Sequence, residues 1–279
     1  MIQYQNPEKY QGNYWKTAVS RIDRNVIELR GYPLGEISGR VSYVEAIILL
    51  LRGDLPSEME SNVVNAIFTS AMDHQLLNAT ALAARVVVSA NPDPVVGIAT
   101  GVLSFGKVTA GVPSYVVQML NEYHPGTNDP EALQAAAVKL VTDFRGRKDR
   151  IWGFGHPLHD LDGDHYTFRA RYLRERVEEF GLPVDNMVML YELAHTEFLR
   201  QMNNRPFPIN VDGMMGAAFA ELGYTPLEVH ALSPFTMLPG IVAHVVEEIE
   251  DGSPLRIVPD PGYTGLPTRH RPGFEDGAA

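Results

Sequence analysis

Gly153–His165 reads GFGHPLHDLDGDH, and the chain is organised around this stretch. Its glycines leave the backbone free to turn. The preceding segment, Asp143–Arg150 (DFRGRKDR), carries the densest basic cluster of the chain. A glycine turn that bears a histidine behind a basic loop suits an anionic ligand presented to an acid–base group. The same pattern is also compatible with a polar surface loop.

The composition excludes several classes of protein. The chain has 279 residues, of which 45% are hydrophobic and 20% charged, as in ordinary globular proteins. Its formal net charge of −11 argues against nucleic-acid binding, which needs a basic face. Without cysteine, the chain has no disulfide, thiolate zinc site or cysteine nucleophile. No signal-peptide pattern is present, and the longest apolar run, Ala46–Leu51, is too short for a membrane span. We expect a soluble cytoplasmic protein.

Working outward from the central loop, the spacing of apolar residues predicts helices almost everywhere. Only Asn25–Gly31 alternates as a short strand pair would. The expected helices are Tyr43–Arg52, Pro56–Asp73, His74–Ala90, Val95–Phe105, Pro113–Tyr123, Glu131–Phe144, Tyr166–Phe180, Met187–Met202, Asn210–Leu222, Pro226–Pro239 and Gly240–Glu250. The sequence therefore predicts an all-α fold. No low-complexity linker interrupts it, so we expect any second domain to be inserted in the first.

Four reactive residues lie in apolar surroundings. His74 opens an apolar helix, Thr109 lies in a glycine-rich break, His156 is in the central loop, and Asp212 lies in PINVDGMMGAA. A lone acid among small apolar residues should have a raised pKa, which suits a base that removes a proton from carbon. Structural roles remain open: Asp212 as a helix N-cap, His74 as a core histidine, and Thr109 as a packing residue.

The central loop also raises the possibility of a metal site. Six potential ligands lie within ten positions: His156, His159, Asp160, Asp162, Asp164 and His165. Their order does not fit a calcium EF-hand, because Gly163 comes too early and Arg171 stands where the bidentate acid belongs. HExxH is absent. We expect no catalytic metal, and a metal hydrolase remains an alternative.

Five segments, in order, resemble the citrate synthase superfamily. They are MDHQLLNATALAARVVVSA from Met72, GVLSFGKVTAG from Gly101, GFGHP from Gly153, PINVDG from Pro208, and GIVAHVVEEIEDG from Gly240 followed by PDPGYTG. The Gly101–Gly111 segment is closer in pattern to citryl-CoA lyases and the lyase portion of ATP-citrate lyase. Citrate synthases place a histidine there, in L-H-G-G, where this chain has Thr109.

The resemblance implies a citrate synthase-like, all-helical homodimer. Residues 1–112 and 211–279 would form a large domain, and residues 113–210 a smaller inserted helical domain. The active site would lie in the cleft between the two domains. Its small-molecule ligand would be an acyl thioester of coenzyme A, with no metal and no nucleic acid or membrane as partner.

The resemblance also implies residue roles. Asp212 would exchange a proton with the α-carbon of the acetyl group, and His156 and His74 would contact the partner acid. Thr109, or a backbone N–H beside it, would take the place of the synthase histidine. We expect the rest of the substrate to be bound by His159, His165, Arg169 and Asn210, the first three as replacements for arginines that the family has and this chain lacks. Those implied to bind coenzyme A are Arg145, Arg147, Lys148, Arg150, Gly153, Phe154 and Gly155.

Three departures concern the arginines that hold citrate in this family. At the three positions where the family has these arginines, this chain has Gly163-Asp164-His165, Met237 and Val258-Pro259-Asp260. Because arginine–carboxylate contacts are strong, their loss should weaken citrate binding severely. We therefore expect a citryl-CoA lyase-like carbon–carbon lyase or synthase that acts on a substrate other than citrate. A non-catalytic CoA-thioester-binding homologue and a condensing acyltransferase of the citrate or methylcitrate synthase type remain alternatives.

Overall fold

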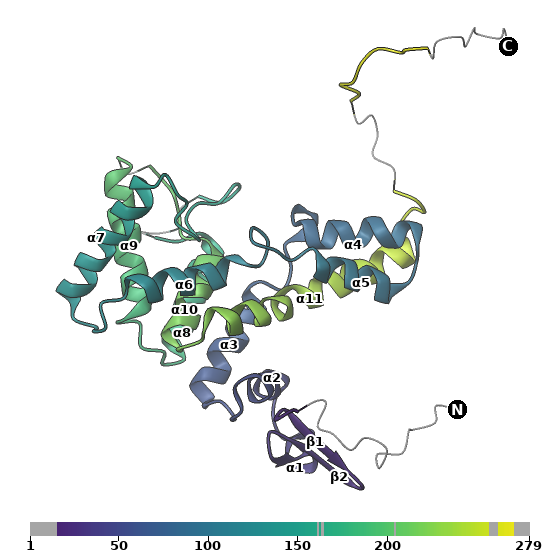
Figure 1. Ribbon diagram of the computed structural model, residues 1–279, viewed down its shortest axis with the longest axis horizontal. Coiled ribbons are helices and arrows are strands. Elements are labelled where there is room, and N and C mark those ends of the chain that lie inside the picture. The colour runs from purple at the N-terminus through teal and green to yellow at the C-terminus, as the bar shows by residue number, and fades with distance from the viewer. Residues whose placement is uncertain (1–15, 161, 163–164, 204, 257–261, 271–279) are drawn as a thin grey trace, which may run out of the picture.

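The computed structural model describes residues 16–160, 162, 165–203, 205–256 and 262–270. Within them the chain is mainly helical, which confirms the predicted fold class (Figure 1). The helices are α1 (Leu34–Ile37), α2 (Tyr43–Arg52), α3 (Glu58–Ser70), α4 (Ala79–Ala90), α5 (Pro94–Leu103), α6 (Val112–Tyr123), α7 (Pro130–Gly146), α8 (Phe168–Glu179), α9 (Met187–Gln201), α10 (Val211–Glu221) and α11 (Pro226–Asp251).

A short antiparallel sheet precedes the helices, where the sequence predicts a strand pair. Its order is β1-β2-β3, with β1 at Ser20–Asp23, β2 at Val26–Leu29 and β3 at Tyr32–Pro33. Helix α2 begins at a capping box. Ser42 and Glu45 exchange side-chain-to-backbone hydrogen bonds there, and Gly53 ends the helix in the left-handed conformation.

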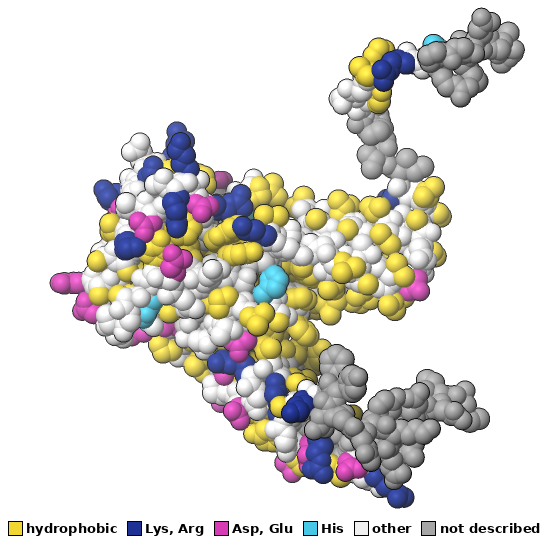
Figure 2. All heavy atoms as spheres, in the orientation of Figure 1, with side chains coloured by type: hydrophobic (Ala, Val, Ile, Leu, Met, Phe, Trp, Pro, Cys, Tyr) yellow, Lys and Arg dark blue, Asp and Glu magenta, His cyan; other side chains and the backbone are white. Residues whose placement is uncertain are grey.

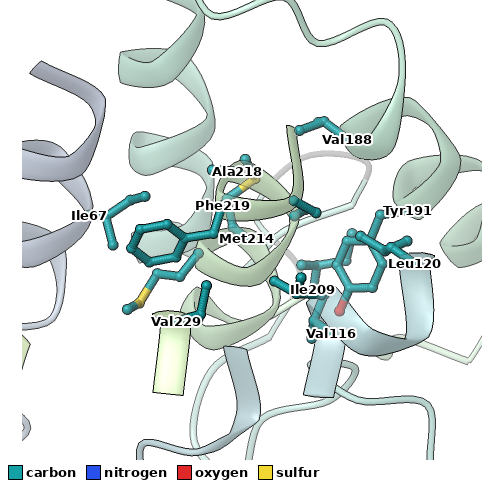
Figure 3. Close-up of a cluster of buried hydrophobic side chains, with 14 of the residues drawn as sticks. Ile67, Val116, Leu120, Val188, Tyr191, Ile209, Met214, Ala218, Phe219 and Val229 are labelled. Atoms are coloured by element: carbon teal, nitrogen blue, oxygen red, sulfur yellow. The ribbon is translucent and has the colours of Figure 1, made fainter. Parts of the chain in front are cut away.

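The core has two parts. The larger part gathers buried side chains from α2, α3, α6 to α10 and the start of α11, and includes the residues labelled in Figure 3. The smaller part consists of Ala84 and Val88 from α4 and Ile241 and Val245 from α11. In Figure 1, α11 runs from one group of helices to the other. It is thus the element common to both parts of the core.

Helix α11 differs from the prediction, because it continues through both of its internal prolines. The expected end at Pro239 is therefore wrong. Proline lacks an N–H group and ordinarily interrupts a helix. Here the residues beyond it stay helical because Ile241 and Val245 are buried in the smaller core. Gly240 permits a close approach: a Cβ there would lie 2.4 Å from the backbone oxygen of Met72.

A second difference concerns His74, which does not open a helix. It precedes a single 3-10 turn, Gln75–Leu77. Helix α4 begins only after Asn78, whose side chain accepts a hydrogen bond from the N–H of Thr80. This cap takes precedence over the apolar periodicity that predicts a longer helix. His74 is left in a loop with its ring free to face a cavity.

The lobe of α4, α5 and α11 carries an apolar surface (Figure 2). Its exposed side chains include Leu82, Val86, Val95, Leu103 and Val246.

Of the described helices, α11 is long and apolar enough to cross a membrane by length and composition alone, a test that core helices also pass. It packs here against α3, α4, α5 and α6. The division into residues 1–112 with 211–279 and residues 113–210 stays a prediction.

Candidate active site

Asn210 holds the start of α10 against the central loop. Its Oδ1 accepts a hydrogen bond from the N–H of Gly213 (3.0 Å), which makes Asn210, not Asp212, the N-cap of α10. Its Nδ2 donates to the backbone oxygen of Gly155 (2.9 Å), and its own N–H donates to that of Gly153 (2.9 Å). Asp212 is thus the second residue of the helix, and its carboxylate does not cap the helix.

The glycines of the central loop are needed for this close packing. Gly153 has a φ of +82°, and a Cβ there would lie 2.2 Å from the Tyr191 hydroxyl and 2.4 Å from the Cα of Gly213. The N–H of Gly155 (φ +88°) donates to the backbone oxygen of Pro208 at 2.7 Å. The Tyr191 hydroxyl donates to the oxygen of Trp152 at 2.6 Å. These contacts bring GFGHP and PINVDG, some fifty residues apart, into one unit.

Asp212 and His156 line the same cavity, of about 560 Å³. Burial raises the pKa of the Asp212 carboxyl to about 6, while the charge of Arg169 acts in the opposite direction. No described residue is close enough to donate a hydrogen bond to this carboxylate. A carboxylate with a pKa near neutrality is suited to both taking and returning a proton.

His156 is held in one tautomer by its own loop. Its Nδ1 accepts hydrogen bonds from the N–H groups of Leu158 (3.1 Å) and His159 (3.0 Å). Burial, together with the charges of His159 and Arg169, lowers the pKa of His156, which favours the neutral ring. Because Nδ1 accepts, the proton of the neutral ring is on Nε2. His156 therefore offers one directed N–H donor.

A second cavity, of about 350 Å³, adjoins the first at His156 and Pro157. It contains His74 and Arg169, whose Nη1 donates to the Nε2 of His74 at 3.3 Å. Burial and the charge of Arg169 lower the pKa of His74 to about 4, against the effect of Asp73. The Nδ1 of His74 is buried and has no partner among the described residues. Since Nε2 accepts from Arg169, Nδ1 is the protonated nitrogen of the neutral ring.

An aromatic pair that the sequence analysis missed lies beside the first cavity. Trp152 lines that cavity and stacks on Tyr115 with a centroid distance of 4.9 Å. The Nζ of Lys107 lies 5.4 Å from both ring centroids, and the guanidinium of Arg150 lies 5.6 Å from that of Trp152. We call these four residues the aromatic rim. Lys107 and Tyr115 have no local signal in the sequence, since their relation to Trp152 depends on tertiary packing.

The predicted coenzyme A residues divide into two groups. Arg150, Gly153, Phe154 and Gly155 line the first cavity. Arg145 instead donates to the backbone oxygen of Gln201 at 2.7 Å, and Arg147 lies over the ring of Phe144. Lys148 is exposed at a left-handed position (φ 56°). The structure therefore does not bring Arg145, Arg147 and Lys148 to the cavity wall.

The remaining predicted residues take different positions. Thr109 lines neither cavity; it exchanges two backbone hydrogen bonds with Gly106, at 2.9 and 3.1 Å. His159 lines the second cavity and stacks on His156. His165 lies against buried His195, with 3.0 Å between their Nδ1 atoms, and is not among the residues that line either cavity. Gly163, Asp164 and the segment 258–260 lie outside the described residues.

The described residues contain no group of three or more histidine or acidic side chains arranged to hold a metal ion.

Comparisons with known proteins identify the family of the chain. The profile of the family described as citrate synthase, C-terminal domain, matches residues 56–258. The chain therefore belongs to the citrate synthase family. The structure of citryl-CoA lyase from Hydrogenobacter thermophilus superimposes with a TM-score of 0.82 at 29% identity, over 93% of this chain and 98% of that one.

Two further relatives are more distant. ATP citrate lyase from Methanothrix soehngenii, solved with citrate and coenzyme A, has a TM-score of 0.76 at 17% identity, over 92% of this chain and 42% of that one. The glyoxysomal citrate synthase of Cucurbita maxima is 26% identical over 256 residues, 88% of this chain and 47% of that protein. The chain thus spans about half the length of the curated relatives that it matches.

Proposed function

We propose that this protein is a citryl-CoA lyase-like enzyme that makes or breaks a carbon–carbon bond next to a coenzyme A thioester. The observation that carries the proposal is the shared cavity of Asp212 and His156. One is a carboxylate with a raised pKa and the other a neutral histidine with a directed N–H group. Membership of the citrate synthase family and the likeness to citryl-CoA lyase support the same reaction class.

In the condensing direction, Asp212 takes a proton from the methyl group of acetyl-CoA. The resulting enolate carbon attacks the carbonyl carbon of an oxo compound, and the carbonyl oxygen takes the proton from Nε2 of His156. The product is a 3-hydroxyacyl-CoA. Cleavage is the reverse and starts from the protonation states that condensation leaves, with Nε2 of His156 deprotonated and Asp212 protonated: Nε2 takes the hydroxyl proton, the carbon–carbon bond breaks, and Asp212 gives its proton to the enolate carbon.

The thioester oxygen needs a donor while it carries the enolate charge. Thr109 was expected in this role, but its N–H is already bonded to Gly106. Val112 begins α6 and lines the cavity. The first N–H groups of a helix have no partner within the helix and carry a positive partial charge. We therefore assign the thioester oxygen to the N–H of Val112, because Pro113, the next residue of α6, has no N–H group.

The aromatic rim suits the nucleotide end of coenzyme A. An aromatic face stacks on adenine, and flanking cations attract phosphates. Trp152 and Arg150 line the cavity that holds Asp212, so an extended thioester bound on the rim would reach that carboxylate. Arg145, Arg147 and Lys148 line neither cavity, and their role in binding coenzyme A stays a prediction.

We also propose that two copies of the chain associate through the apolar surface of α4, α5 and α11. An apolar patch of this kind is characteristic of an interface. Leu103 is 83% exposed within it. Sedimentation velocity should show a dimer that Leu103→Glu dissociates. Leu227→Glu, at a 78% exposed position at the start of α11, should leave the dimer intact.

The test of the proposed function is exchange of solvent deuterium into the methyl group of acetyl-CoA, followed by mass spectrometry, with and without small oxo compounds. Enolate chemistry predicts exchange that disappears in Asp212→Asn. Absence of exchange under every condition would favour the non-catalytic thioester-binding homologue. Activity that is lost on exhaustive chelation would favour the metal hydrolase.

A further inference from the structure

The second cavity is poor in positive charge. Among the described residues that line it, Arg169 is the one lysine or arginine. His74 and His156 do not add to the charge, because the pKa of each is lowered by burial and by Arg169. A carboxylate placed here therefore has one strong cationic partner.

Arg169 has N–H groups that donate to no described residue. Arg169 uses Nη1 for the backbone oxygen of Asp73 (3.2 Å) and for Nε2 of His74 (3.3 Å). Its Nε and Nη2 donate to no described residue. A guanidinium edge with two such donors fits one carboxylate in a bidentate pair.

A second carboxylate would meet an unfavourable field. Asp73, on the cavity wall, is a negative charge. Burial works against its ionisation, but hydrogen bonds from the backbone N–H of Gln75 and from His244 lower its pKa. Nε2 of His244 lies 3.0 Å from the Asp73 carboxylate. The negative charge of Asp73 would repel a second carboxylate, and it already offsets part of the positive charge of Arg169.

The rest of the wall combines uncharged or neutral polar residues, Gln75, Asn78, His159 and Thr167, with apolar ones. Leu77, Pro157, Leu158 and Val211 line the cavity. Behind Asn78, another lining residue, lies the thioether of Met237, with 3.9 Å between Nδ2 and Sδ. A carboxylate placed against the apolar residues would lose its water without gaining a hydrogen bond.

We propose that the oxo partner of this enzyme is a 2-oxo acid with one carboxylate, which Arg169 holds. This inference rests on the proposed function. Acetyl-CoA and R–CO–COO⁻ then give CoA-S–CO–CH₂–C(OH)(R)–COO⁻, with the methyl proton passing to Asp212 and the carbonyl oxygen protonated by His156. Cleavage is the reverse. The R group is apolar or small, in keeping with the leucines and Val211.

Isothermal titration calorimetry of the full chain, without acetyl-CoA, tests the proposal apart from catalysis. The probes are 2-oxobutanoate with one carboxylate, oxaloacetate with two, and butanone with none. We expect 2-oxobutanoate to bind at least about tenfold more tightly than either of the others. Arg169→Gln should weaken it by about 10- to 100-fold, the range for charge-assisted hydrogen bonds. Arg176→Gln is the matched control on α8, because Arg176 pairs with Glu179 and lines neither cavity.

A gain-of-function variant gives a second, independent test. Leu77 is 72% exposed on the cavity wall, so Leu77→Arg adds a cation without disturbing the core. It should improve oxaloacetate binding about tenfold and change 2-oxobutanoate binding little.

Equal or tighter binding of oxaloacetate by the unmodified protein, or no binding of any probe, would overturn the proposal. Deuterium exchange into acetyl-CoA that depends on Asp212 would still stand in either case. The two failures are therefore distinguishable.

Discussion

Asn210 Nδ2 donates to the backbone oxygen of Gly155 across 2.9 Å, while the Oδ1 of the same side chain caps α10 through the N–H of Gly213. One amide thus links the loop of His156 to the helix of Asp212. The donor of this amide can be removed while its acceptor is kept, which makes its contribution measurable.

Asn210→Asp keeps the capping oxygen and loses the donor to Gly155. We expect a small loss of stability and a reduction of kcat with KM little changed, because the loop that carries His156 loses a hydrogen bond that positions it. Asn210→Ala removes both contacts and should cost about 1–2 kcal/mol in the free energy of unfolding. Urea denaturation and steady-state kinetics would measure both. Equal kinetics in Asn210→Asp and the unmodified protein would contradict the positioning role.

Asp212→Asn should abolish deuterium exchange and stabilise the fold at neutral pH. The pKa of Asp212 is raised from its ordinary value to about 6, so the folded state favours the protonated form. Its contribution to stability is present at low pH and is lost as the pH rises towards and through 6. At pH 8 the substitution should therefore gain about 2–3 kcal/mol, and at pH 4 almost nothing. Thermal unfolding at the two pH values measures this, with the exposed Asp54→Asn as the control.

The pH profile of exchange should show one limb set by Asp212. Proton removal needs the ionised carboxylate, so the rate should rise with pH and level off above about 6. The charge of Arg169 lowers this pKa, so Arg169→Gln should move the limb to higher pH. A limb that stays in place would show that Asp212 is not the group observed.

The aromatic rim should contribute to coenzyme A affinity. Trp152→Ala removes the face that stacks on Tyr115, and a loss of about tenfold is expected for one stacked base. Lys107→Ala should cost less, about threefold, and should lose its effect in high salt. The control is Lys139→Ala, whose Nζ lies 4.7 Å from the Tyr123 ring centroid, away from both cavities. Fluorescence or calorimetric titration with coenzyme A gives the comparison.

Gly153→Ala should be severely destabilising. The added Cβ would lie 2.4 Å from the Gly213 Cα, in a backbone conformation with φ of +82°. We expect a loss of about 3 kcal/mol or more. Gly146→Ala is the matched control, because nothing lies within 4 Å of a Cβ there and alanine favours the helix. A folded, active Gly153→Ala protein would show that this contact can relax.

Local patterns were sufficient for most of the fold. The capping box of Ser42 and Glu45 marks the start of α2, and the spacing of apolar residues identifies the major helices. The prediction failed at Pro239, where burial of Ile241 and Val245 outweighs the local preference of proline. It also failed at His74, where the Asn78 cap shortens the helix.

The candidate site was predictable in its residues but not in its geometry. Asp212 and His156 are visible in the sequence because each departs from its apolar or glycine-rich surroundings, whereas Arg169 is one of four arginines in the charged helix α8 and has no such local signal. Their division between two adjoining cavities depends on how the central loop crosses α10, which no local pattern encodes. The neighbourhood of Lys107 and Trp152 depends in the same way on packing between distant segments.

The continuity of α11 has a consequence for how the molecule unfolds. Val229 and Leu232 near its start belong to the larger core, and Ile241 and Val245 to the smaller. Neither core can melt without exposing part of a helix that the other still holds. The two therefore form one cooperative unit, and calorimetry should record a single transition whose van't Hoff and calorimetric enthalpies agree.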